Sequence, residues 1–233
     1  MNFEYSDEQQ QLADSVRKFL AQAYGFEQRK AIINSASGGS EQVWKTFAEM
    51  GLTAIALPEA DGGFGGGAID LMPVMEACGE ALVVEPLLDQ IVAGRLLAKA
   101  GSEAQRAAWL PGLIDGSATL ALATLEPGQR YELAPQGTTA TKSGNGWVLS
   151  GAKCVVVGAA TADRLLVSAR SGKGASLFIV DTKAQGVSLN PCRTVDGQRA
   201  ADVRLDGVTL GADALLGTDG GAQAPIAEAV DFA

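Results

Sequence analysis

Residues 109–128, Trp109-Leu-Pro-Gly-Leu-Ile-Asp-Gly-Ser-Ala-Thr-Leu-Ala-Leu-Ala-Thr-Leu-Glu-Pro-Gly128, mark the point at which the chain changes from helix to strand. The residues from Ala104 to Ile114 favour a helix, which we expect Pro111 to break. The apolar and small residues between Thr119 and Thr124 are typical of a short strand. This stretch therefore predicts a helical first half and a β-rich second half.

Before this point the sequence predicts helices only. Leu12, Val16 and Phe19 recur at helical spacing, and Ser6 stands three residues before Gln9 in a pattern that resembles a capping box. Three further expected helices have glycine or proline at their boundaries: a short helix from Ser40 closed by Gly51, residues 69–79, and residues 85–100. The agreement of these local signals indicates an all-α N-terminal domain over residues 1–115.

After this point short strands follow one another, with glycine, aspartate and asparagine turns between them. They are expected at residues 119–124, 138–141, 147–149, 155–157, 164–168, 176–180 and 201–205. No helix of ordinary length fits between them, which favours an antiparallel β-barrel or sandwich over a βαβ sheet. We expect this β middle domain over residues 116–222, followed at 223–233 by the first turns of another helical domain, with Pro225 near the helix start. The fold class is thus α+β and multidomain.

The composition excludes several classes of function. A net charge of −9 with scattered basic residues argues against a nucleic-acid surface. The absence of histidine excludes His-based acid–base catalysis, Ser/His/Asp triads and His-ligated metals. The three cysteines, Cys78, Cys154 and Cys192, have no paired spacing, so we expect reduced thiols and neither a disulfide framework nor a metal site.

No stretch of the sequence predicts a membrane span or a targeting segment. The longest apolar runs, such as Leu110–Ile114, are far shorter than the roughly 20 residues that cross a bilayer. The N-terminal segment is polar and acidic, so a cytoplasmic location is expected. The glycine cluster from Gly62 to Gly67 departs from the spacing of a dinucleotide-binding loop, since Ala68 replaces the last glycine, and it is expected to be a plain interhelical loop.

Five local strings, taken in order, resemble the acyl-CoA dehydrogenase family. They are the opening segment with Ser6-Asp-Glu-Gln-Gln10; Met50-Gly-Leu52 with Leu57-Pro-Glu59 and Gly62-Gly63; Trp109–Gly116; Ala123-Thr-Leu-Glu-Pro-Gly128, similar to a T-E-P-G segment; and Gly151-Ala-Lys153, similar to a G-x-K before a W-I-T strand. Together they cover essentially the whole chain. The resemblance implies a helical N-terminal domain, a β middle domain and a C-terminal four-helix bundle that this chain does not contain.

The resemblance also implies a chemistry. Members of the family bind FAD and acyl-CoA, and they desaturate the acyl chain when a carboxylate removes the α-proton and the β-hydrogen leaves as hydride to the flavin. The family's catalytic glutamate lies in the C-terminal helical domain, beyond Ala233, so we name no catalytic residue. Electron-transfer flavoprotein is the acceptor that the resemblance suggests. This chemistry needs no histidine, which agrees with the composition.

The strings most relevant to the flavin depart from the family pattern. Leu125 stands where the family has the threonine that bonds the flavin pyrimidine, and Val155-Val-Val157 stands in place of W-I-T, so two side-chain anchors are missing. The expected cofactor-binding residues are Ala123, Thr124, Leu125, Val155, Val156 and Val157. The alternative is that they are ordinary strand core.

The next loop departs as well, since Gln129-Arg-Tyr-Glu132 replaces the small residues of A-G-S-D. Gly128, Arg130 and Tyr131 are the expected substrate-binding residues, with a solvated loop as the alternative. Glu126 is expected to form a turn rather than to act as a base. Lys153 is interpreted as a turn charge, and Cys154 as a small buried apolar residue.

These departures, with Val84-Glu-Pro-Leu-Leu88, make the chain resemble most the small subunit of a heteromeric acyl-CoA dehydrogenase, such as the pimeloyl-CoA dehydrogenase type. The first hypothesis is a subunit or fragment that works with a larger FAD-bearing partner or by self-association. The second is a non-catalytic scaffold or acyl-CoA-binding partner whose flavin site is degenerate. A flavin oxidase or monooxygenase is a third reading of the same fold.

Overall fold

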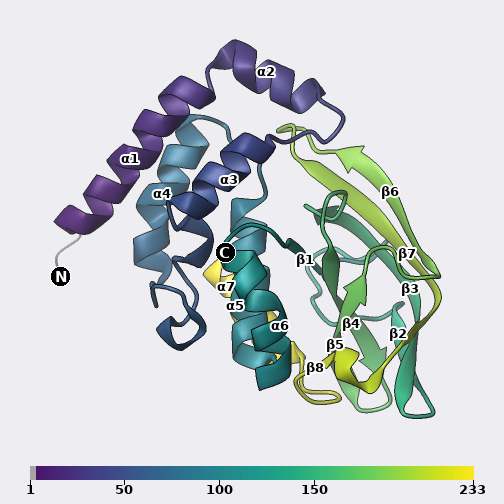
Figure 1. Ribbon diagram of the computed structural model, residues 1–233. Helices are drawn as coiled ribbons and strands as arrows, with labels where there is room; N and C mark the ends of the chain where they lie inside the picture. Colours follow the sequence, from purple (N-terminus) through teal and green to yellow (C-terminus); the bar gives the residue numbers. More distant parts are fainter. Residues whose placement is uncertain (1–3) are drawn as a thin grey trace.

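The structure is a computed structural model that describes residues 4–233, and its first half is helical (Figure 1). The helices of this half are α1 (Asp7–Ala23), α2 (Phe26–Asn34), α3 (Glu41–Glu49), α4 (Ala68–Glu80), α5 (Leu87–Ala100) and α6 (Glu103–Ile114), with two short 3-10 helices, η1 (Leu52–Ala54) and η2 (Glu59–Asp61). The predicted helices are all present. Helix α2 was not predicted, and it has no buried residue.

Local capping explains where the helices begin. The Ser6 hydroxyl accepts a hydrogen bond from the Gln9 amide at the start of α1, and the Gln9 side chain accepts one from the Ser6 amide, which completes the predicted capping box. Ser40 caps α3 in the same way through the amide of Val43. Gly51 follows α3 with a φ of +76°, a conformation that suits glycine at a helix end.

The expectation that Pro111 breaks its helix is wrong, because α6 continues through Pro111 to Ile114. Proline removes one backbone hydrogen bond, here the one to the carbonyl of Ala107. Ala107 is exposed, so water can satisfy that carbonyl. The Pro111 carbonyl itself accepts a hydrogen bond from the amide of Asp115, 3.0 Å away, and so ends the helix in the usual way.

The second half of the chain forms one mixed sheet whose strands lie in the order β6-β7-β3-β2-β4-β5-β8, with β1 beside β4. The strands are β1 (Leu120–Ala123), β2 (Thr139–Ser143), β3 (Gly146–Val157), β4 (Arg164–Ser171), β5 (Gly174–Asp181), β6 (Val187–Arg193), β7 (Arg199–Leu210) and β8 (Leu215–Leu216). A 3-10 helix, η3 (Ala212–Ala214), precedes β8. The helical half followed by a β half confirms the predicted fold class.

The sheet differs from the prediction in three details. Most neighbours are antiparallel as expected, but β1 and β2 each pair with β4 in parallel, β2 through the single pair Thr139 and Arg170. The expected strands at 147–149 and 155–157 are two ends of one bulged strand, β3. Strand β6 was not predicted. It contains Pro191, which is tolerated there because β6 is an edge strand.

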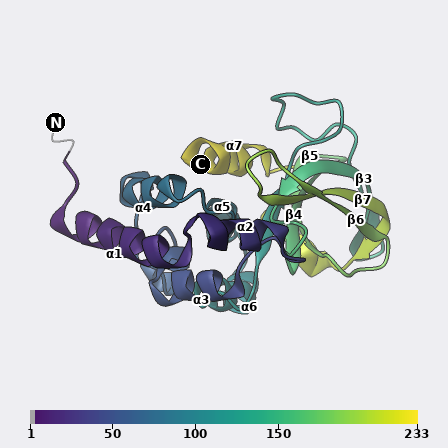
Figure 2. The same cartoon turned by 90° about the horizontal axis from the view of Figure 1, so that it is seen from above.

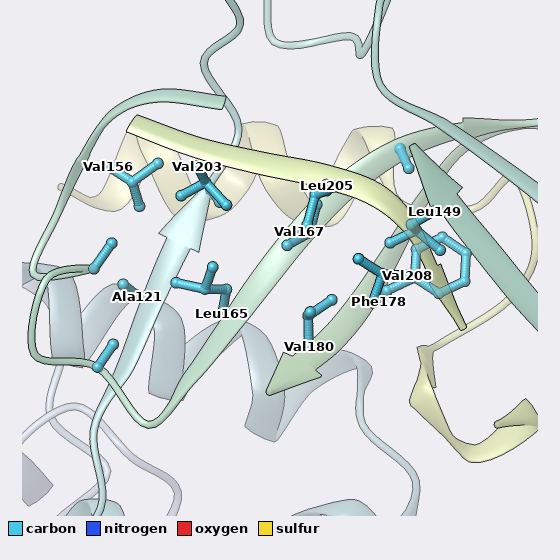
Figure 3. Packing of buried hydrophobic residues seen from close by; sticks show 14 of the residues in the cluster. Ala121, Leu149, Val156, Leu165, Val167, Phe178, Val180, Val203, Leu205 and Val208 are labelled. Atoms are coloured by element: carbon cyan, nitrogen blue, oxygen red, sulfur yellow. The ribbon is translucent and has the colours of Figure 1, made fainter. Parts of the chain in front are cut away.

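One apolar core fills the sheet, and a separate one joins the sheet to the helices. The interior of the sheet is filled by alternating side chains, among them Leu149, Val167, Phe178 and Val203 (Figure 3), and the ring of Phe178 packs edge-on to Trp147 at 5.2 Å. A separate cluster joins α5 and α6 to β1, β4 and to α7 (Gln223–Phe232), which starts beyond the sheet and lies along α5. Helix α5 is therefore the element that connects the helical half, the sheet and α7.

A polar contact joins α2 to the hairpin of β6 and β7. Arg193 and Arg199 face each other across the hairpin and donate to the carbonyls of Ile33 and Ser35, at the C-terminal end of α2. Arg29 donates in the opposite direction, to the carbonyl of Asp196 at the hairpin tip. Cations near the last carbonyls of a helix complement its dipole, so the hairpin stabilises the end of α2. Figure 2 shows α2 on the side of the sheet where this hairpin lies.

Within residues 4–233, none of the helices has the length and apolar character of a membrane span.

Candidate cofactor and substrate site

A cavity of about 210 Å³ lies between the sheet and the helices, where β1 ends and β3 bulges. One wall is made of strand residues and the loop after β1, and the other of residues from α5 and α7. The lining consists of Leu88, Asp89, Val92, Leu122, Thr124, Leu125, Cys154, Val155, Val156, Val157, Val230 and Ala233. The lining is therefore almost entirely apolar, with Asp89 as its one carboxylate side chain.

The strand wall takes its shape from a bulge in β3. The pairing of β3 with β7 shifts between Lys153 and Val156, and Val155 has a φ of +49°, an unusual conformation for a β-branched residue. Two hydrogen bonds hold this conformation: the Cys154 amide donates to the Leu125 carbonyl, and the Val155 amide donates to the Asp202 carboxylate, each over 3.0 Å. The bulge leaves the Val155 side chain 47% exposed.

Directly inward from the bulge, Lys153 is fully buried, so the expectation that it is a turn charge is wrong. Its Nζ donates to the Glu126 carboxylate at 2.8 Å, to the Ser168 hydroxyl at 3.0 Å and to the Thr124 carbonyl at 3.2 Å. These three acceptors match the three protons of an ammonium group. Lys153 therefore fills the gap between β1 and β2, which pair with different parts of the same edge of β4.

Glu126 is a structural carboxylate. Besides Lys153, it accepts hydrogen bonds from the backbone amides of Gln136, Gly137 and Thr138, at 2.9, 2.6 and 3.0 Å. Burial raises the pKa of this carboxyl, but the bonds from Lys153, Gly137 and Thr138 outweigh burial and lower the pKa to about 2. A carboxylate so fully bonded has no free lone pair for a substrate, so Glu126 closes the 126–138 loop and is not a base.

Five of the six residues predicted to bind a cofactor meet in the cavity. Thr124, Leu125, Val155, Val156 and Val157 come from two segments about 30 residues apart in sequence, and all line it. The exception is Ala123, which is completely buried and lies outside the lining. Burial and Asp202 raise the pKa of Cys154, so its thiol is protonated and behaves as the small, partly buried group that the sequence suggests.

The three predicted substrate-binding residues are not brought to the cavity. Gly128, Arg130 and Tyr131 lie on the loop between β1 and β2, which projects from the body of the molecule in Figure 2. Arg130 is exposed, and Tyr131 is 94% exposed. Their role in binding a substrate stays a prediction.

Two residues near the cavity were missed by the sequence reasoning, Lys153 and Asp89. A signal existed for Lys153, because Trp147, Leu149, Gly151 and Lys153 stand two apart, and every second residue of a strand faces the same side. Asp89 gave a different signal: it is the third residue of α5, where an acid favours the helix start. That position is sufficient to explain an aspartate, so the sequence does not indicate that this side chain also lines a cavity.

The cavity suits a flat or elongated apolar group better than a whole FAD molecule. Its strand wall offers Val155, Val156 and Val157 as a smooth apolar surface, with Thr124 as the hydroxyl-bearing residue. None of its lining residues is a lysine or arginine that could bind a diphosphate. The volume is also below the roughly 300–1,000 Å³ that is usual for ligand pockets. The residues that line this cavity therefore do not by themselves make a complete FAD site.

The fold and this cavity define a class of protein, and family models identify it. Residues 6–117 match the model of the acyl-CoA dehydrogenase N-terminal domain, and residues 121–208 match that of the acyl-CoA dehydrogenase middle domain. The chain belongs to the acyl-CoA dehydrogenase family, which is FAD-dependent.

Individual relatives agree with the family. The chain is 35% identical to the acyl-CoA dehydrogenase FadE12 of Mycobacterium tuberculosis, over 97% of this chain and 60% of that protein. A variant of the "Tcur3481-Tcur3483 steroid ACAD" superposes with a TM-score of 0.86 at 34% identity, over 97% of this chain and 60% of that one. The ChsE4-ChsE5 complex of Mycobacterium tuberculosis shares the fold, with a TM-score of 0.88 at 23% identity, over 98% and 61% of the two chains. The chain thus spans about three fifths of the length of these relatives.

Proposed function

We propose that this chain forms one side of the flavin and acyl-chain cleft of an acyl-CoA dehydrogenase. As a subunit or fragment it contributes to FAD-dependent α,β-desaturation of an acyl-CoA thioester in the cytoplasm. The observation that carries the proposal is the cavity, in which Thr124, Leu125 and Val155–Val157 converge from separate segments. These are the positions that the resemblance assigns to the flavin. Family membership supports the same role.

The chain's own residues account for binding and shielding rather than for proton removal. The strand wall and the helix wall enclose an apolar space, which excludes water from a bound acyl chain. The buried pair of Glu126 and Lys153 keeps the loop after β1 in place behind that wall. The base for the α-proton and the groups that bind the FAD diphosphate are proposed to come from another part of the assembly, a larger FAD-bearing subunit. FAD bound there would supply the acceptor for the hydride, and an electron-transferring flavoprotein is the proposed acceptor of the electrons.

The rim of the cavity supports an assembled form. Leu125, Val155 and Val230 are 39%, 47% and 40% exposed and stand around the opening. Apolar side chains gathered at a cavity mouth are typical of a surface that another chain covers. Relatives with the same fold are titled as two-component complexes, which supports a heteromeric partner for this chain. Light scattering on the purified chain should show self-association or, after addition of a candidate FAD-bearing subunit, a stable complex.

A second candidate function is a non-catalytic subunit that completes a partner's cleft. The observation that favours it is the strand wall itself, because Leu125, Val155 and Val157 provide no side-chain hydroxyl or aromatic ring for a flavin. In this second function the cavity has the shape of the family's cleft but lacks the side chains that contact the flavin in the family pattern.

Restoring the anchors distinguishes the two functions. Leu125→Thr and Val157→Thr each return a hydroxyl to the wall, and Val148→Thr makes the same change on β3 outside the cavity as a matched control. FAD binding is measured by fluorescence quenching for each chain, alone and with the partner. If the wall binds flavin, each restoring variant should bind FAD about 5–10-fold more tightly, the worth of one hydrogen bond, and the control should not change.

The two candidate functions predict different results in these measurements. Flavin absorbance in the purified chain, with the affinity gains above, supports a flavin-lining subunit. A colourless chain that completes the dehydrogenase activity of a partner, with no response to the restoring variants, supports the scaffold. A chain that binds no flavin, no acyl-CoA and no partner contradicts both functions.

A further inference from the structure

Asp89 is a carboxylate without a partner in an apolar cavity. It stands on the helix wall, one residue after Leu88 and three before Val92, opposite the strand wall. Among the residues that the structure describes, no hydrogen bond or ion pair reaches its carboxylate except from its own backbone amide. Asp89 is only partly buried, so its side chain is not sealed inside the protein. Because it also lines the cavity, a ligand in the cavity can reach it.

The charges around Asp89 do not compensate it. The lining contributes Cys154, a protonated thiol, from β3, and no lysine or arginine. The hairpin of β6 and β7 contributes Asp196, a like charge. Burial and Asp196 together raise the pKa of Asp89, which shows that the protein supplies no group that favours the ionised form enough to offset them. A donor for this carboxylate must come from outside the described residues, and a ligand in the cavity can supply it.

We propose that Asp89 determines the specificity of this cavity: it selects an acyl chain that carries a hydroxyl within reach of the helix wall and rejects a chain that ends in a carboxylate. This inference rests on the proposed function, because it assumes that the cavity receives the acyl chain. A hydroxyl can donate to Asp89 and satisfy it, whereas an alkyl chain covers the charge without a donor. A second carboxylate adds like-charge repulsion in a site of low polarity.

The inference distinguishes between classes of acyl chain. A dicarboxylic acyl chain of the pimeloyl kind needs a cation or a cluster of amide donors at its far end. The cavity presents an aspartate instead. Acyl chains that bear a hydroxyl, from a hydroxylated fatty acid or a hydroxylated ring system, are the class that fits.

Direct binding tests the inference without relying on turnover. Isothermal titration calorimetry at pH 7 compares octanoyl-CoA, 8-hydroxyoctanoyl-CoA and the mono-CoA ester of octanedioic acid, together with the corresponding four- and six-carbon sets, binding to the chain or to its complex with the partner. For at least one chain length, the hydroxylated thioester should bind about tenfold more tightly than the carboxylated one, since like-charge juxtaposition costs more than 1.4 kcal/mol. Asp89→Asn keeps the size of the side chain and should reduce this ratio to about twofold or less.

A matched control and a separate readout keep the two proposals distinct. Asp206→Asn removes one carboxylate from the exposed face of β7 and should leave the ratio unchanged. If the unsubstituted thioesters bind but the wild type does not discriminate between hydroxyl and carboxylate, the specificity inference is overturned and the proposed function stands. Discrimination that survives in Asp89→Asn also overturns it. If no thioester binds to any form, the proposed function fails, and the inference fails with it.

Discussion

Lys153 and Val155 are two residues apart on β3, and they belong to opposite kinds of environment. Around Lys153 every donor of the ammonium has an acceptor, and Glu126 accepts from four donors. Around Val155 the strand bulges, apolar side chains line a cavity, and the one carboxylate there has no partner beyond its own backbone. The difference teaches that polarity alone does not mark a functional site. The fully satisfied charges hold the loop in place, and the unsatisfied one faces the cavity.

The largest expected effect comes from breaking the satisfied region. Lys153→Met should destabilise the chain by about 3–5 kcal/mol, because it leaves the buried Glu126 without its counter-charge. Urea unfolding followed by circular dichroism measures this, with Lys183→Met as an exposed lysine control that should stay within about 0.5 kcal/mol of the wild type. A loss below about 1 kcal/mol for Lys153→Met would contradict a structural role for the pair.

The next effect is a dependence of stability on pH. The folded pKa of Glu126, about 2, is below the ordinary value, so its contribution to stability is present above pH 4.5 and is lost as the pH falls toward 2. By pH 3 the loss should amount to about 2 kcal/mol, at roughly 1.4 kcal/mol for each pKa unit, because the last part of the titration lies below that pH. The free energy of unfolding at pH 7, 5, 4 and 3 tests this. Glu126→Gln should be less stable at pH 7 and should show a flatter profile; an equally steep profile would assign the acid sensitivity to other carboxylates.

The strained bulge should respond in the opposite direction. Val155→Asn replaces a β-branched residue at a φ of +49° by one that tolerates this conformation, and should stabilise the chain by about 1 kcal/mol. Val148→Asn makes the same change where β3 is extended, and should destabilise it by a similar amount. Thermal unfolding of the two variants compares them directly. Two variants that both lose stability would mean that Val155 packs better than its exposure indicates.

The smallest expected effect concerns Asp89. Its folded pKa is raised, so the folded state prefers the protonated carboxyl, and stability falls as the pH rises through that pKa. Asp89→Asn should therefore raise the melting temperature at pH 7 by up to about 2–4 °C, and by nothing at pH 3. If instead the variant is less stable at pH 7, the interaction of Asp89 with the start of α5 outweighs its burial.

The sequence predicts well those parts that rest on local signals. The sequence shows the capping box at Ser6 and the cap at Ser40 through residues that are close together in the chain. The change from helix to strand near Gly116 is equally local, so the helices before Gly116 and the strands after it could be placed. Helix α2 and strand β6 could not be placed, because neither has a fully buried residue that would give a local pattern. The hairpin of β6 and β7 and the end of α2 contact each other, and this contact joins residues that are distant in sequence. The sequence alone also does not show that β6 lies at the edge of the sheet, where Pro191 is tolerated.

The candidate site divides in the same way. The cavity wall followed from motifs, since Thr124, Leu125 and Val155–Val157 occupy positions that the resemblance marks. The pair of Glu126 and Lys153 did not, because its residues are 27 positions apart and meet only when β1 and β3 assemble around β4. Asp89 was missed for a different reason. An aspartate in the first turn of a helix is common, so the sequence gave no separate sign that this residue lines a cavity.

The contact between α2 and the hairpin of β6 and β7 has a consequence for how the chain folds during synthesis. The bonds from Arg193 and Arg199 to the end of α2 join residues that are 160 and 164 positions apart. At about 5–20 residues per second, a ribosome needs roughly 10–30 s to deliver the hairpin after α2 has been made. A helix of nine residues is only marginally stable by itself. During that interval α2 has only its contacts with the helical half, the packing of Ile32 and Ile33 and the hydrogen bond from Arg29 to the Leu82 carbonyl. The bonds from the hairpin to the end of α2 are therefore the last of its contacts to form.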